Sequence, residues 1–148
     1  MNLYLAASSD TKTKISAYAY KLSNYEIVSA KHDSSTTPRE LLIGLKNMLT
    51  YIVQYSISES EKEFTLFTNN EFVINMINED KLIEWRNSSW MKSNGEEVAN
   101  KDVLNALHQF IMFFKEKHIT LYATKPVTSE EINILNSVSK AALARRKF

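Results

Sequence analysis

The chain has 148 residues, of which 44% are hydrophobic and 24% charged, a balance typical of a globular protein that can bury a sizeable core. Its formal net charge is only +1, so any binding to nucleic acid must use a local basic surface and not a global positive field. The lack of cysteine excludes disulfides and thiolate metal sites, and two glycines are too few for a glycine-rich phosphate-binding loop.

No segment of the sequence is typical of a membrane protein. The longest apolar runs are far too short to span a bilayer, and the first ten residues lack the cationic region of a signal peptide. We therefore expect one domain over residues 1–148, placed in the cytoplasm and without a membrane partner.

Three strands are expected at the start of the chain. In the second, Ala17 and Ala19 share one face while Tyr18 and Tyr20 share the other, the period of two that indicates a strand. The short links between strands predict hairpins, with Asp10 as a turn residue. The expected strands are Met1–Ser8, Lys12–Leu22 and Asn24–Lys31.

A helix is predicted to begin at Thr37. Thr37 would be the N-cap, Pro38 the first helical residue, and Glu40 the third, where its side chain can close a capping box. The leucines and isoleucines that follow recur with the 3.6-residue period of an amphipathic helix.

The rest of the chain alternates strands and helices. Asn69 follows the fourth strand and is expected to cap the next helix, Asn100 is expected to cap a later one, and Thr128 opens a capping box. The order predicts an α/β fold with a mixed five-stranded sheet and helices on both faces. The further elements are the strands Glu63–Thr68 and His118–Ala123 and helices over Asn70–Ile77, from Asn100, and from Thr128 to the basic residues Arg145, Arg146 and Lys147.

The block from Trp85 to Val103, WRNSSWMKSNGEEVANKDV, resembles the tryptophan-rich basic handle of ribonuclease H and the helix start that follows it. The spacing of the two tryptophans and of the V-A-N-K-D run carries this resemblance. Residues Thr36–Leu49 are similar to the family's helix with the signature T-x-N-x-M-E-L-x-A. The element order also matches, so the resemblance covers nearly the whole chain. It implies a ribonuclease H-like fold of strand order 3-2-1-4-5, with a handle at about residues 79–101.

The resemblance also implies where the family's chemistry would lie. Ribonuclease H holds two Mg²⁺ ions with four carboxylates, and these positions correspond here to Ala6, Glu40, Asn69 and a residue on or next to Asn136. Two divalent ions about 4 Å apart repel by roughly 17 kcal/mol at an effective dielectric of 20, which one carboxylate cannot offset. The segment Tyr122–Pro126 replaces the family's histidine loop, and the three histidines lack ligand spacing. We therefore expect a pseudoenzyme with no catalytic residue, metal or cofactor.

Three functions remain open at this stage. The first is a non-catalytic module that binds RNA–DNA hybrid or other duplex nucleic acid through its handle. The alternative for the basic residues of the handle is an ordinary solvated surface, because acidic residues lie among them. The alternative for the tryptophans is that they pack the handle onto the body of the protein. The second is a protein-interaction or self-association module on the same scaffold. The third is an active nuclease that uses Mg²⁺ and relocated carboxylates such as Asp10, Glu40 and Glu71. The candidate binding residues of the first are Lys81, Trp85, Arg86, Trp90, Lys92 and Lys101.

Overall fold

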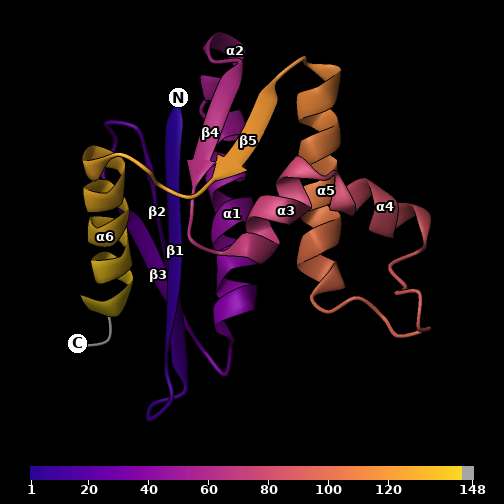
Figure 1. The fold of residues 1–148 in the computed structure, drawn as a ribbon, viewed down its shortest axis with the longest axis horizontal. Helices are drawn as coiled ribbons and strands as arrows, with labels where there is room; N and C mark the ends of the chain where they lie inside the picture. Colours follow the sequence, from indigo (N-terminus) through magenta and orange to yellow (C-terminus); the bar gives the residue numbers. More distant parts are fainter. Residues whose placement is uncertain (145–148) are drawn as a thin grey trace.

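The fold is built on one five-stranded sheet in the order β3-β2-β1-β4-β5 (Figure 1). The computed structural model describes residues 1–144, so Arg145, Arg146 and Lys147 of the predicted last helix lie outside the described residues. Strands β1, β2 and β3 pair antiparallel, β4 runs parallel to β1, and β5 runs parallel to β4. The predicted strand order and the mixed sheet are confirmed. The strands are β1 (Asn2–Asp10), β2 (Ile15–Leu22), β3 (Val28–Asp33), β4 (Glu63–Phe67) and β5 (Thr120–Thr124).

Helices cover both faces of this sheet. Helix α6 lies against β1 and β2 on one face, α1 lies on the other face, and α4 extends away from the sheet with the loop that follows it (Figure 1). No helix among the described residues is both long enough and apolar enough to cross a membrane. The helices are α1 (Thr37–Gln54), α2 (Ile57–Ser60), α3 (Glu71–Asn78), α4 (Lys81–Asn87), α5 (Lys101–Glu116) and α6 (Ser129–Ala144).

The alternation of side chains along β1 and β2 divides the core into two layers. Tyr18 and Tyr20 belong to the large cluster under α1, whereas Ala17 and Ala19 belong to a smaller cluster under α6. The period of two in the sequence predicted this division. The small alanine side chains let α6 approach the sheet closely, and this places one face of α6 beside the middle of β1.

Gly44 sets how closely α1 approaches the sheet. A Cβ atom at this position would lie 2.9 Å from Leu5 Cδ1 and 3.0 Å from Tyr18 Cδ1, closer than such atoms normally come. Glycine therefore permits the contact of α1 with β1 and β2. The first turn of α1 lies beside β1 as a result.

The predicted starts of β2, β3 and β5 are wrong, because the backbone forms turns at residues where the sequence pattern had indicated a strand. Lys14, with φ of 58°, ends the β1–β2 turn, so β2 begins at Ile15. His118, also with φ of 58°, follows α5, so β5 begins later than predicted. Residues 24–27 form the link before β3 and are not part of it. The short helix α2 was not predicted.

Candidate functional site

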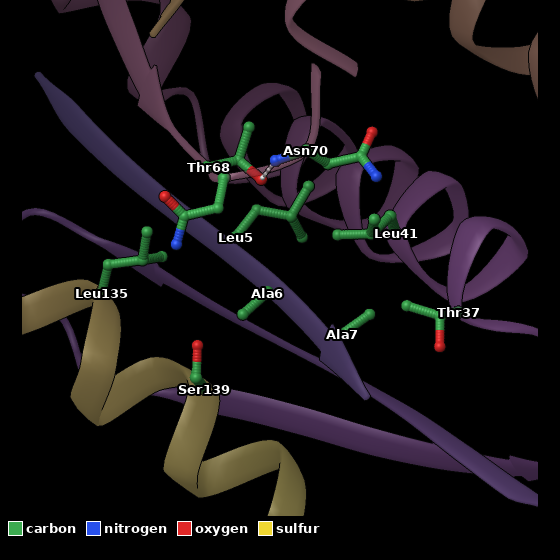
Figure 2. A pocket seen from close by; sticks show the side chains of 10 residues that line it. Leu5, Ala6, Ala7, Thr37, Leu41, Thr68, Asn70, Leu135 and Ser139 are labelled. Atoms are coloured by element: carbon green, nitrogen blue, oxygen red, sulfur yellow. Dashed lines mark hydrogen bonds between the residues drawn. The ribbon is translucent and has the colours of Figure 1, made fainter. Parts of the chain in front are cut away.

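A hollow of about 290 Å³ opens between β1, the end of β4, the start of α1 and one face of α6 (Figure 2). We call it the central hollow. Figure 2 shows Ala6 and Ala7 of β1 between Ser139 of α6 and Thr37 of α1. None of the described residues that line it is charged. Its lining comprises Leu5, Ala6, Ala7, Thr37, Leu41, Thr68, Asn69, Asn70, Leu135 and Ser139.

Ala6 and Asn69, at two of the four positions where the resemblance implies carboxylates, line this hollow. Asn69 is exposed and comes two residues after β4 ends at Phe67. The prediction that Asn69 caps the next helix is wrong by one residue. Asn70 is the N-cap of α3, because its Oδ1 accepts a hydrogen bond of 2.9 Å from the backbone N–H of Val73. The side chain of Asn69 does not cap the helix and lines the hollow instead.

Glu40, the one carboxylate that remains, is not part of the lining of the hollow. Its side chain is fully buried and accepts hydrogen bonds from His32 Nδ1, at 2.8 and 3.0 Å, and from Ser35 Oγ at 2.8 Å. Both partners come from the segment of β3 and the turn after it. Glu40 therefore ties the edge of the sheet to α1.

The predicted capping box at the start of α1 is also wrong. Thr36, not Thr37, is the N-cap, and its Oγ1 accepts a hydrogen bond of 3.2 Å from the backbone N–H of Arg39. Glu40 is then the fourth helical residue, one position too far to reach back to the cap. The capping box at the last helix is confirmed, because Thr128 Oγ1 accepts from Glu131 N at 3.1 Å and Glu131 Oε1 accepts from Thr128 N at 3.0 Å.

On α6, the hollow is lined by Leu135 and Ser139, which are four residues apart on one face. Asn136 is exposed and is not among the lining residues. The predicted correspondence of the fourth carboxylate position to Asn136 or a residue next to it stays a prediction.

The carboxylates that could have been relocated do not converge. Asp10 Oδ1 accepts from Lys12 N at 3.0 Å in the β1–β2 turn, as its predicted turn role requires. Glu71 Oε1 pairs with Lys125 Nζ at 2.9 Å, and this hydrogen bond lowers the pKa of Glu71. In the part of the chain that the structure describes, no three His, Cys, Asp or Glu side chains form a group that could hold a metal ion. The residues present at the hollow do not fit a pair of Mg²⁺ ions, which prefer carboxylate oxygens.

The two tryptophans of the handle have different environments. Trp90 is only 9% exposed and meets His108 of α5 edge-on, with ring centroids 6.4 Å apart. Burial, and then the charge of Arg86, lowers the pKa of His108. Trp90 therefore packs the handle onto α5. Trp85 is half-buried and stacks on Phe72 of α3 at 5.9 Å with the ring planes 17° apart.

Trp85 and Phe72 belong to a second cavity of about 350 Å³, which we call the handle groove. It is mainly apolar, and Lys92 is its one charged lining residue among those described. Leu41 and Asn70 line both cavities, so the handle groove adjoins the central hollow. The other lining residues of the handle groove are Pro38, Leu42, Val73, Val98, Ala99 and Asn100.

The four basic residues predicted for the handle differ in their partners. Lys81 Nζ lies 3.5 Å from Glu84 Oε2, and Lys101 Nζ lies 3.0 Å from Glu97 Oε2. Over residues 1–144, neither Arg86 nor Lys92 has a carboxylate within ion-pair distance, and both are exposed. Arg86 and Lys92 are therefore the two basic side chains best placed for a phosphate.

A clamp that the sequence did not reveal joins α1 to the start of α5. Arg39 Nη1 donates to Asp102 Oδ1 at 3.1 Å and Nη2 donates to Asp102 Oδ2 at 2.7 Å, while Nη1 also donates to Asn100 Oδ1 at 3.1 Å. The hydrogen bonds from Arg39 lower the pKa of Asp102 to about 2, and the pKa of Arg39 is raised. Asn100 occupies the predicted cap position, but its side chain serves the clamp instead of the helix.

Known proteins share the fold of this chain. No protein-family model matches the chain. A ribonuclease H of Syntrophomonas wolfei is 28% identical over 89 residues, which are 60% of this chain and only 57% of that protein.

Two solved structures of the foamy viral protease-reverse transcriptase have the same fold. The one in complex with RNA/DNA hybrid superposes with a TM-score of 0.74 and 12% identity, over 97% of this chain and 19% of the viral chain. The one in complex with dsDNA has a TM-score of 0.71 and 11% identity, over 96% of this chain and 89% of that chain. At such low identity these likenesses show the fold.

The fold is ribonuclease H-like, as the pattern of the handle and of the first helix predicted, and the chain is similar in sequence to a ribonuclease H over 60% of its length. At the centre of the candidate site, the described residues that line the hollow carry no charge.

Proposed function

We propose that this chain is a non-catalytic ribonuclease H-like module that binds RNA–DNA hybrid or another duplex through its handle. The observation that carries this proposal is the lining of the central hollow. Ala6 and Asn69 line it at two positions where the resemblance implies carboxylates, and Glu40 is engaged by His32 and Ser35. Without acidic ligands, the site lacks the groups that hold two metals for phosphodiester hydrolysis.

Binding is supported by the surface that remains around the hollow. Trp85 and Phe72 offer a stacked aromatic pair, and Lys92 lies at the same groove. Arg86 adds a second exposed positive charge on α4. Contacts between such cations and phosphates release counterions, which favours binding without regard to sequence. The viral proteins of the same fold are in complex with RNA/DNA hybrid and with dsDNA, and this supports a duplex as the partner.

A titration with labelled hybrid, duplex DNA and duplex RNA tests the proposal, with binding and cleavage scored on the same samples. Neutralising about four phosphates gives a log–log salt slope near −3.6, so affinity should fall roughly 150-fold between about 50 and 200 mM salt. The double variant Arg86→Gln, Lys92→Gln should flatten the slope by about two units.

A matched control removes two charges outside the handle, with Lys31→Gln on β3 and Lys46→Gln on α1, and should leave the slope nearly unchanged. The proposal fails if none of the three duplexes binds at low salt, or if the chain cleaves hybrid in Mg²⁺ and Glu40→Gln abolishes that cleavage.

A second candidate, a protein-interaction or self-association module, is favoured by one observation at the opposite edge of the sheet. Tyr25 and Val28 are 43% and 41% exposed beside a cavity of about 350 Å³ at the edge strand β3. Tyr51 packs edge-on against Tyr25, and its ring lies 4.5 Å from that of Tyr55 with the planes tilted by 35°. Exposed aromatic patches of this kind mark contact surfaces. Sedimentation of the wild type and of Val28→Lys over a range of concentrations would reveal self-association through this edge.

The organisation of residues 1–148 as one domain and a cytoplasmic location stay predictions.

A further inference from the structure

We propose that the central hollow receives a phosphate of the bound nucleic-acid backbone directly, with no divalent cation between them. This inference rests on the proposed function, because it assumes that a duplex is bound at the handle. The residues that line the hollow do not fit a pair of Mg²⁺ ions, so a ligand of another kind can occupy it.

Charge decides what such a hollow can accept. A cluster of carboxylates repels a phosphate unless metal ions lie between the two. Here the lining carries no charged side chain among the described residues, so this repulsion is absent. A phosphate oxygen can then accept hydrogen bonds from neutral donors, and hydrogen bonds to an anion are stronger than those between neutral groups.

Asn69, Asn70 and Ser139 line the hollow and can donate hydrogen bonds to a ligand. Asn70 uses its Oδ1 to cap α3 through Val73 N, which leaves its NH₂ group for a ligand. The amide of Asn69 and the hydroxyl of Ser139 make no hydrogen bond to other described residues. Figure 2 shows Ser139 on the α6 side of the hollow and Asn70 on the opposite side, above α1. Donors therefore approach the hollow from two sides.

Thr37 has a different role at the rim. Ser16 Oγ donates to Ser35 O at 3.1 Å, so Ser16 accepts from Ser9 across 2.7 Å. Ser9 has then used its one proton, so Thr37 Oγ1 donates to Ser9 Oγ across 2.6 Å. This chain of hydroxyls fixes the first turn of α1 against β1 and β2. It holds the rim in place before any ligand arrives.

The hollow is also placed on the path of a strand bound at the handle. Leu41 and Asn70 line both cavities, and Lys92 lies in the handle groove. A backbone that places one phosphate near Lys92 can place a nearby phosphate in the central hollow. Lys92 supplies the charge and the hollow supplies neutral donors.

The test measures hybrid affinity by fluorescence anisotropy, in EDTA and in Mg²⁺ at matched ionic strength. The variants are Asn69→Asp and Ser139→Asp, which add one negative charge to the lining from two different elements. The control is Asn24→Asp, which makes the same chemical change as the first variant in the exposed turn before β3. Thermal unfolding of each variant shows that it is folded.

We expect Mg²⁺ not to raise the affinity of the wild type. In EDTA, Asn69→Asp and Ser139→Asp should each lower affinity about fivefold or more, since one charge about 4 Å from a phosphate has this effect even at the dielectric of water. Asn24→Asp should change it less than about twofold, because distant exposed charges are screened.

Two results would overturn the inference and leave duplex binding intact: a severalfold rise in wild-type affinity with Mg²⁺, or lining variants that bind like the control. If neither the wild type nor any of the variants binds a duplex, the proposed function fails and this inference fails with it.

Discussion

The clamp between Arg39 and Asp102 gives a quantitative prediction. Replacing Asp102 with asparagine removes the charge while it keeps the shape of the side chain. The pKa of Asp102 falls from 3.8 to about 2, which corresponds to an upper limit of about 2.4 kcal/mol of stabilisation. The side chains of Arg39 and Asp102 are 35% and 66% exposed, so solvent screening reduces the expected contribution to about 1 kcal/mol. Asp102→Asn should therefore lower the melting temperature by about 3 °C near neutral pH.

The dependence on pH has a definite sign. Because the folded state lowers the pKa of this carboxyl, its stabilisation is fully present above the unfolded value near 3.8 and is lost as pH falls through about 2. Urea unfolding of wild type and Asp102→Asn between pH 7 and pH 2 should show a constant difference that shrinks below about pH 4.

Asp33→Asn, an exposed aspartate of β3, is the matched control for the loss of one carboxylate. The reasoning is refuted if Asp102→Asn is as stable as wild type at pH 7, or if its deficit is the same at pH 7 and at the acid end of the series.

Three further predictions concern the core and the handle. Gly44→Ala should destabilise by about 1–3 kcal/mol despite alanine's higher helix propensity, because the new Cβ would contact β1 and β2 too closely; urea unfolding that shows a gain in stability would contradict this. Glu40→Gln should cost about 1–3 kcal/mol, because glutamine has one acceptor oxygen where the carboxylate offers two, to His32 and to Ser35, while hybrid affinity stays unchanged; a clear loss of affinity in anisotropy titrations would place Glu40 in the binding site instead. Trp90→Ala should cost about 3–5 kcal/mol because Trp90 is buried, whereas Trp85→Ala should cost less stability and weaken hybrid binding; equal effects of the two variants in both assays would argue against separate roles.

Local patterns were sufficient to predict most elements of this chain. The alternation along β2 predicted which residues face α1 and which face α6. The spacing of apolar residues predicted α1, and the box of Thr128 and Glu131 predicted the start of α6. These features depend on residues a few positions apart, so the sequence shows them directly. The spacing around Trp85 and Asp102 carried the likeness that the fold confirms.

The orientation of individual side chains at the site could not be predicted in the same way. Successive residues of a helix point about 100° apart, so an uncertainty of one position decided whether Leu135 or Asn136 faces the hollow. A similar error of one residue moved the cap of α3 from Asn69 to Asn70.

The sequence by itself determined most of the elements and their order, because these depend on residue type and short-range spacing. The tertiary structure alone decided that Glu40 bonds to His32 on β3 and that Arg39 reaches Asp102, 63 residues away. It also decided that the two cavities adjoin at Leu41 and Asn70. Such contacts form only when distant segments pack together, and no local spacing in a single sequence encodes them.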